Sequence, residues 1–290
     1  MRELGLFFGE IDPIALKLGP IAVHWYGVII GIAVLLALYL SIKEGERSGI
    51  QEDNFYDFLI VALPVAIICA RIYYVVFEWN YYASNPAEII RIWDGGIAIY
   101  GGLIGAVLTL IIFCRVKKLS PWLFMDVMAP TVIMAQGIGR WGNFFNQEAH
   151  GVQTTRAFLE RLCLPDFIIN QMKIDGIYYQ PTFLYESIWD LLGFGILMCL
   201  RHKNHLFKRG EVVLSYVIWY SFGRFFIEGM RTDSLMLGPL RVSQWLSVFL
   251  FFFGIGLILY RRYWHPHNPW YLDGNVDYDL KFYLIKCYFK

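Results

Sequence analysis

Seven long apolar segments constrain what this chain can fold into. Each is about 20 residues long, the length that a helix needs to cross the hydrocarbon core of a bilayer. The segments are residues 21–41, 55–77, 96–114, 121–140, 181–200, 211–230 and 243–260. Because an open sheet would leave backbone groups unpaired in lipid, helices are the structure that fits. The sequence predicts an all-α integral membrane protein whose residues 1–262 form seven transmembrane helices.

The residue composition supports a membrane protein and argues against other classes. Hydrophobic residues make up 57% of the chain and charged residues 17%, whereas soluble domains are nearer one half and one quarter. The net charge of +1 gives no overall field that would attract nucleic acid. The five cysteines lack CxxC spacing and the histidines lack HxxxH spacing, so we expect no metal and no cofactor.

Lysine and arginine residues favour one side of the predicted membrane. They follow the first, third, fifth and seventh segments, at Lys43 and Arg47, in 115–118, in 201–209, and at Arg261 and Arg262. Loops rich in these residues stay on the cytoplasmic side. We therefore expect the N-terminus outside, the C-terminus and a tail at 263–290 in the cytoplasm, and an external cap formed by the long connection 141–180.

With this orientation, most of the predicted helices place polar side chains near their outer ends. These side chains include Tyr26, Arg71, Tyr100, Arg140, Tyr185, Glu186, Arg224, Glu228 and Arg231. A charge near the bilayer centre costs about 2.5–3.5 kcal/mol or more, so such groups normally pair inside the protein. The arginines exceed the carboxylates that need them, and a guanidinium group without a carboxylate suits a phosphate. The pattern predicts a pocket for a phospholipid headgroup that opens to the outer leaflet.

Single members of this set also fit simpler roles. Arg71 and Arg231 fit equally well as side chains that reach from a helix end to the membrane surface. Tyr26 and Tyr100 fit the aromatic belt of a membrane protein. Glu186 and Asp190 lie one turn apart and can form a structural polar pair, like Arg224 with Glu228. The convergence of the groups, rather than any one of them, favours a binding site.

The stretch "GRWGNFFNQEAHG", residues 139–151, carries the most specific pattern in the chain. It fits G-R-x-G-N-F-x-N-x-E-x-x-G at every fixed position, and it resembles the signature of bacterial prolipoprotein diacylglyceryl transferases. Four further segments resemble that family in order: 11–27, 70–77, 95–106 and 180–187. So does "RFFIEGMR", residues 224–231. Seven spans with an external N-terminus agree with the family's architecture.

The resemblance implies a reaction. Members of the family move the diacylglyceryl group of phosphatidylglycerol to the thiol of the lipobox cysteine of a preprolipoprotein. The product is a thioether, and glycerol phosphate leaves. The enzyme would lie in the bacterial cell membrane with its site on the outer-leaflet side, and no cofactor is implied. No feature of the sequence requires an oligomer, so a monomer is expected.

The resemblance also implies roles for residues. Arg140 and Arg224 would bind the headgroup and stabilise the charge of the departing phosphate. Asn143 would hydrogen-bond to the headgroup or the backbone, and Glu148 would orient Arg140 or the loop. Tyr26 matches a tyrosine that the family needs for activity.

Further substrate-binding residues would support these arginines. Glu228 and Arg231 match a carboxylate–arginine pair that holds Arg224. Gly142 and Gly151 would permit tight turns beneath the cap, and Gly151 and Arg71 complete the predicted set.

Tyr100 is the one departure from the family pattern. Many members have a histidine there, which is favoured as the base that takes the thiol proton. A phenol is a weak base at neutral pH unless nearby arginines favour the phenolate. Tyr100 is therefore a candidate catalytic residue, and a conformational or packing role fits it equally well.

Three other functions fit parts of the pattern. A transporter or flippase of an anionic lipid or solute would also need arginines in a cavity, but we see no internal repeat of the kind many transporters have. A receptor or scaffold would bind the lipid without turnover. An alcohol phosphotransferase would normally have an aspartate-rich metal motif, and the sequence has none.

Overall fold

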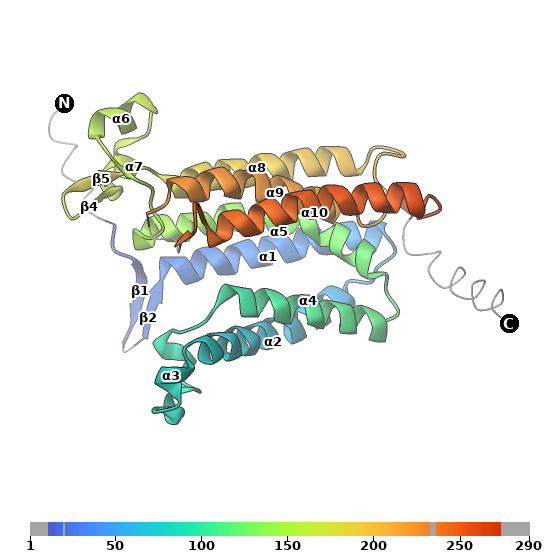
Figure 1. The fold of residues 1–290 in the computed structure, drawn as a ribbon, viewed down its shortest axis with the longest axis horizontal. Coiled ribbons are helices and arrows are strands. Elements are labelled where there is room, and N and C mark those ends of the chain that lie inside the picture. Colours follow the sequence, from blue (N-terminus) through green and yellow to red (C-terminus); the bar gives the residue numbers. More distant parts are fainter. Residues whose placement is uncertain (1–10, 20, 233–235, 274–290) are drawn as a thin grey trace. The chain divides into compact units, whose positions relative to one another are not determined.

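The computed structural model describes residues 11–19, 21–232 and 236–273, and it is mostly helical (Figure 1). The long helices are α1 (Trp25–Arg47), α2 (Asp53–Phe77), α4 (Ile99–Val116), α5 (Pro121–Asn146), α8 (Thr182–Arg201), α9 (Glu211–Met230) and α10 (Val242–Trp264). All of them except α9 are long and apolar enough to cross a membrane. The expectation of a helical, multi-pass membrane protein is confirmed, whereas the number of spans stays a prediction.

Two boundaries differ from the predicted spans. Residues Ile21–His24 form strand β2, which pairs with β1 (Ile14–Leu18) in an antiparallel hairpin, so the first long helix begins only at Trp25. At the second boundary, α5 continues past the predicted end at residue 140 to Asn146. The predicted start of the cap at residue 141 is therefore wrong, because residues 141–146 are still helical. Of the predicted tail 263–290, residues 274–290 lie outside the part of the chain that the structure describes.

The chain divides into two compact units. Of the described residues, unit 1 comprises those within 11–40 and 126–272, and unit 2 comprises 41–125 and residue 273. Unit 1 contains α8, α9, α10 and most of α1 and α5. Within it, α9 packs against both α8 and α10. A short hairpin of β6 (Met236–Leu237) and β7 (Leu240–Arg241) leads into α10, and η4 (Tyr271–Asp273) follows it.

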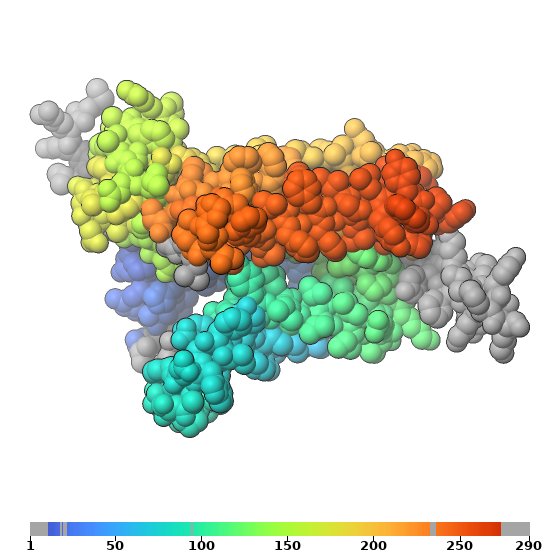
Figure 2. All heavy atoms as spheres, viewed as in Figure 1, coloured from blue at the N-terminus to red at the C-terminus, as the bar shows by residue number. Residues whose placement is uncertain are grey.

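A small folded cap lies between α5 and α8 in unit 1. It contains β3 (Gln153–Thr154), α6 (Arg156–Arg161), α7 (Asp166–Gln171), β4 (Lys173–Ile174) and β5 (Ile177–Tyr179). The three strands form a sheet in the order β3-β5-β4. Leu159, Ile168 and Ile169 are buried against Phe144 of α5 and Phe183 of α8. The cap therefore packs on the helix ends, and Figure 2 shows it as a lobe beyond the end of α8.

Unit 2 is built on the antiparallel pair α2 and α4. A side chain at Gly101 would collide with the backbone of α2 at Cys69, and one at Gly105 would lie 2.8 Å from Cβ of Cys69. The two glycines thus let the helices approach closely, as is common between membrane helices. Between them lie α3 (Trp79–Tyr82), η2 (Pro86–Glu88) and η3 (Ile92–Asp94).

The first turn of α9 is capped by a side chain from another helix. Asp126 of α5 is fully buried, and its carboxylate accepts hydrogen bonds from the N–H groups of Gly210, at 2.5 Å, and Val213, at 2.8 Å. These N–H groups have no acceptor within the helix, and a negative charge there suits the helix dipole.

We expect Asp126→Ala to destabilise the protein by about 2–4 kcal/mol, because two charge-assisted hydrogen bonds are lost and two buried donors are left unpaired. Asp126→Asn, which keeps one acceptor oxygen, should cost less. The measurement is the free energy of unfolding in detergent. Equal stability of the alanine variant and the unmodified protein would contradict the prediction.

Candidate active site

The glycine-rich stretch 136–151 is helical for most of its length. Gly139 and Gly142 lie on the side of α5 that faces α1. A methyl group on Gly142 would lie 2.5 Å from Cδ2 of Tyr26, and one on Gly139 would lie 3.0 Å from Cδ1 of Ile30. Gly142 therefore allows the ring of Tyr26 to lie directly on the helix backbone. The expectation that Gly142 makes a turn is wrong.

The turn after α5 uses residues other than glycine. Gln147 and Ala149 have φ angles of 54° and 56°, in the left-handed region, whereas Gly151 does not. The N–H of Gly151 donates to the carbonyl oxygen of Gln180 at 3.0 Å, and Gly151 forms an isolated bridge with Arg231. A methyl group at 151 would lie 3.0 Å from side-chain atoms of Gln180 and Thr182. Close packing, not a turn, therefore requires this glycine.

Four charged side chains from three helices form a continuous chain of ion pairs. Nε of Arg140 on α5 pairs with Oε2 of Glu186 on α8, and Oε1 of the same carboxylate pairs with Nη1 of Arg224 on α9. Nη2 of Arg224 lies 2.5 Å from Oε2 of Glu228, one turn further along α9. One carboxylate thus holds two guanidinium groups side by side. We call these four residues the ion-pair chain.

The ion-pair chain is largely shielded from solvent. The side chain of Glu228 is 2% exposed and that of Glu186 is 8% exposed, whereas Arg224 and Arg140 are 17% and 20% exposed. An isolated buried charge costs several kcal/mol, so the alternation of sign is what allows these groups to lie between membrane helices. The two arginines are therefore the more exposed members of the ion-pair chain.

Neighbouring groups tie the ion-pair chain to the helices around it. The hydroxyl oxygen of Tyr220 lies 3.5 Å from Nη2 of Arg140. Arg241, the last residue of β7 and the N-cap of α10, donates to the carbonyl oxygen of Glu228 at 2.6 Å and also to that of Arg231. These contacts join the end of α9 to the start of α10, next to the ion-pair chain.

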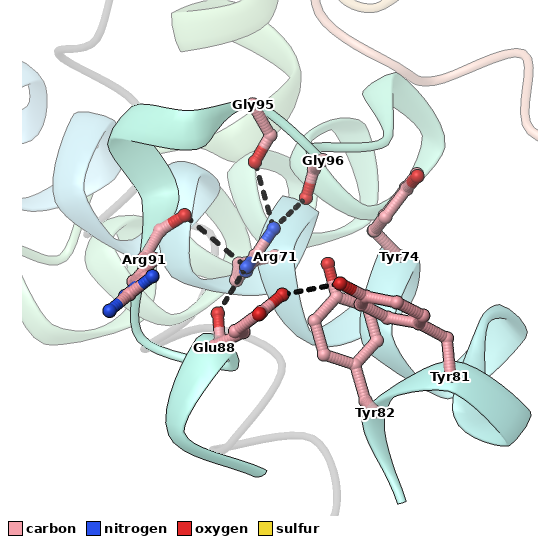
Figure 3. A pocket seen from close by; sticks show the side chains of 8 residues that line it. All are labelled: Arg71, Tyr74, Tyr81, Tyr82, Glu88, Arg91, Gly95 and Gly96. Atoms are coloured by element: carbon pink, nitrogen blue, oxygen red, sulfur yellow. Dashed lines mark hydrogen bonds between the residues drawn. The ribbon is translucent and has the colours of Figure 1, made fainter. Parts of the chain in front are cut away.

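Arg71 lies in unit 2, where the backbone holds it. Its guanidinium group donates to five carbonyl oxygens at 2.7–3.3 Å, those of Glu88, Ile89, Arg91, Gly95 and Gly96. Figure 3 shows the bonds to Glu88, Arg91, Gly95 and Gly96. Arg71 is 7% exposed, and it lies over the ring of Tyr82. Arg71 also lines a pocket of about 270 Å³, together with Tyr74, Tyr81, Tyr82, Glu88, Arg91, Gly95 and Gly96. Since carbonyl groups already accept its N–H groups, these contacts favour a structural role for Arg71 over phosphate binding.

The other predicted residues are distributed over both units. Tyr100 lies in the first turn of α4, in unit 2. Asn143 lies near the end of α5, and its carbonyl oxygen accepts the N–H of Glu148 at 3.0 Å. Glu148 is exposed and accepts a hydrogen bond from the Asn146 side chain at 3.4 Å. The structure gives Arg140 a different carboxylate partner, Glu186.

Glu186 is the central residue that the sequence reasoning left out of the site. Its spacing from Asp190 suggested a polar pair within α8, but its carboxylate contacts arginines on two other helices. The signal that was available is its position: Glu186 is a buried carboxylate near the outer end of an apolar segment, and such residues normally have a functional or pairing role. Among the described residues, no cluster of His, Cys, Asp or Glu has the arrangement of a metal site.

Comparison with known proteins identifies the same family that the sequence motifs resemble. The family described as prolipoprotein diacylglyceryl transferase matches residues 13–260. The chain belongs to this family. It is 66% identical to the phosphatidylglycerol–prolipoprotein diacylglyceryl transferase of Ligilactobacillus salivarius, over 92% of this chain and 99% of the relative. It is 62% identical to the enzyme of that name from Lactiplantibacillus plantarum, over 92% and 95% of the two chains.

A relative from a third genus carries the same name. The transferase of Listeria monocytogenes serotype 4a is 61% identical over 93% of this chain and 97% of the relative. The resemblance seen in the sequence is therefore confirmed. This transferase is a multi-pass protein of the bacterial cytoplasmic membrane, and the ion-pair chain is its candidate active site.

Glu186→Gln removes a charge that two guanidinium groups share. We expect it to destabilise the transferase by about 3–5 kcal/mol, the usual cost of breaking a buried ion pair from one side. The matched control is Glu160→Gln, whose carboxylate is 53% exposed and pairs with Arg156 on the cap; this change should have little effect. Unfolding in detergent measures both. Similar losses for the two variants would show that the ion-pair chain is not important for stability.

Gly142→Ala places a methyl group too close to the ring of Tyr26. We expect a loss of about 1–3 kcal/mol, the usual cost of overpacking, together with reduced activity because Tyr26 moves. Gly31→Ala is the control, since a methyl group on that glycine of α1 meets nothing within 4 Å. Thermal unfolding and turnover are measured on both variants. Full activity and unchanged stability of Gly142→Ala would refute the proposed packing.

Proposed function

We propose that the ion-pair chain binds the phosphate of phosphatidylglycerol, the donor lipid from which this transferase moves the diacylglyceryl group to the cysteine thiol of a prolipoprotein. The observation that carries the proposal is the placement of Arg140 and Arg224 on either side of one carboxylate, with both arginine side chains partly exposed. Each guanidinium group has five N–H groups, so both keep donors for a phosphate after forming these ion pairs. Paired arginines suit the oxygens of a phosphate.

The chemistry requires charge stabilisation at the leaving group. The sulfur of the cysteine attacks the glycerol carbon that carries the phosphate, a C–S bond forms, and the C–O bond to the phosphate breaks. Glycerol phosphate leaves with the electron pair of that bond, and the thiol proton passes to a base. Negative charge on the phosphate grows during this step, so the donors of Arg140 and Arg224 act most strongly in the transition state.

Several residues would complete this site. Tyr26 of α1 lies on Gly142 of α5, and Asn143 directly follows that glycine. We assign both Tyr26 and Asn143 to the reaction. Glu228 positions Arg224 through their ion pair. Glu148, Gly151 and Arg231 belong to the loop that follows α5 and its bridge to the end of α9. We keep Tyr100 as the candidate base, and we assign Arg71 to the support of its own loop.

The membrane topology belongs to the same proposal. α9 would be the seventh span, since it has 20 residues and packs between α8 and α10. Its lower hydropathy is a consequence of Arg224 and Glu228, which pair inside the protein rather than contacting lipid. Basic residues end α8 and α10 on the cytoplasmic side, so the N-terminus and the ion-pair chain would face the outer leaflet. The site needs only one chain, which supports a monomer.

The first test is an assay of the purified protein in detergent with phosphatidylglycerol and a lipobox peptide. Mass spectrometry should detect the diacylglyceryl group on the peptide cysteine. Arg140→Ala and Arg224→Ala should each lower turnover by at least about 100-fold, as expected for the removal of a donor that stabilises developing charge. Arg156→Ala, an exposed arginine of the cap, is the matched control and should be fully active. Binding or movement of the lipid without product would favour the transporter alternative.

The role of Tyr100 is tested separately. If its hydroxyl group takes the thiol proton, Tyr100→Phe should lose most of the activity and Tyr100→His should retain it, because imidazole is a better base near neutral pH. The pH dependence of turnover is measured for the histidine variant and the unmodified enzyme. An active phenylalanine variant would remove Tyr100 from the chemistry and leave it a packing role.

A further inference from the structure

Two tryptophans on α8 and α9 make a reciprocal contact. Trp189 donates its indole N–H to the carbonyl oxygen of Trp219, and Trp219 donates its own to the carbonyl oxygen of Trp189, both at 3.0 Å. The rings are stacked, with centroids 4.3 Å apart and planes inclined by 13°. We call Trp189 and Trp219 the tryptophan pair. Neither residue belongs to the ion-pair chain.

Each indole lies against a glycine of the opposite helix. A methyl group on Gly193 would collide with Nε1 and Cδ1 of Trp219, and one on Gly223 would collide with the same atoms of Trp189. The sequence therefore contains the pattern W-x-x-x-G twice, as "WDLLG" at 189–193 and "WYSFG" at 219–223. In this antiparallel arrangement, the tryptophan of each copy meets the glycine of the other.

These contacts specify one register of α8 against α9. An indole N–H between membrane helices must find an acceptor, since lipid offers none. A slip of one helical turn, about 5.4 Å, would break both hydrogen bonds at once. It would also move both indoles away from the glycines, toward positions that carry side chains. The register is therefore fixed by four contacts that are lost together.

The register of these helices sets the central ion pair of the site. Glu186 lies one turn before Trp189, and Arg224 directly follows Gly223. Their side chains meet across the same helix interface. An ion pair needs its charged atoms within about 4 Å, so a slip of one turn is enough to separate Glu186 from Arg224.

We propose that Trp189 and Trp219 are positioning residues of the transferase, which set Glu186 against Arg224 and so hold Arg224 in place for the donor phosphate. This inference rests on the proposed function, because it needs Arg224 to contact the donor. It assigns to the tryptophan pair a part in donor recognition, at a distance from the reacting atoms.

The conservative test replaces each tryptophan with phenylalanine, which keeps an aromatic ring and removes the N–H. We expect Trp189→Phe and Trp219→Phe each to raise the KM for phosphatidylglycerol about tenfold, the effect of roughly one hydrogen bond. The KM for the peptide should not change. A variant that is only less well folded would lower kcat through its folded fraction and leave both KM values unchanged, so the donor KM separates the two roles.

A second pair of variants tests the steric contact. Gly223→Ala should lower activity strongly, because its methyl group meets the pyrrole ring of Trp189. Trp189→Phe removes that ring, so the double variant should be more active than Gly223→Ala alone. Gly195→Ala is the matched control on α8, since a methyl group there meets nothing within 4 Å, and it should behave like the unmodified enzyme.

The outcomes distinguish this inference from the proposed function. Arg224→Lys, measured in the same assay, should also raise the KM for phosphatidylglycerol. If Arg224→Lys raises this KM and the tryptophan variants leave it unchanged, the role of the tryptophan pair is refuted and the proposed function stands. If Arg224→Lys leaves the donor KM unchanged, the proposed role of Arg224 fails first. A lower Tm of the tryptophan variants with unchanged KM values, or no recovery in the double variant, also counts against the inference.

Discussion

The carboxylate of Glu186 is the interaction on which the rest of the site depends. It is buried among membrane helices, and it contacts the guanidinium groups of Arg140 and Arg224 at the same time. Without Glu186, the two guanidinium groups would repel each other, and burying either one unpaired would have a large energetic cost. With Glu186 between them, ion pairs link α5, α8 and α9, and each guanidinium group still has N–H groups beyond those in the ion pairs.

Glycines and tryptophans lie at the helix interfaces that bring these charged groups together. Gly137 of α5 approaches Asp190 and Leu191 of α8, and Trp141 donates to the hydroxyl of Ser187 at 3.2 Å. Small residues let membrane helices approach closely, but they do not by themselves choose a register. Hydrogen bonds from indole N–H groups can select one register, because an unpaired donor is costly inside the membrane.

The sequence was enough to predict the helices but not their partners. Apolar length predicted all seven long helices, since the bilayer requires about 20 residues per span. It missed the hairpin that precedes Trp25, because the apolar residues of its second strand run directly into the first long helix. It also missed the continuation of α5 to Asn146, because glycines and polar residues look like the end of a helix until their packing is known. The i, i+4 spacing predicted the pair of Arg224 with Glu228. The contacts of Glu186 join three helices, and spacing along one helix cannot reveal them.

The balance of charge in the ion-pair chain bears on how a transferase of this kind favours its transition state. Two arginines and two glutamates cancel, so a bound phosphodiester would gain little from net charge and would bind mainly through directed hydrogen bonds. In the proposed reaction, the departing phosphate acquires a second negative charge next to the same donors when the C–O bond breaks. The arginine donors then act more strongly on the reacting state than on the bound lipid, which is the condition for faster turnover.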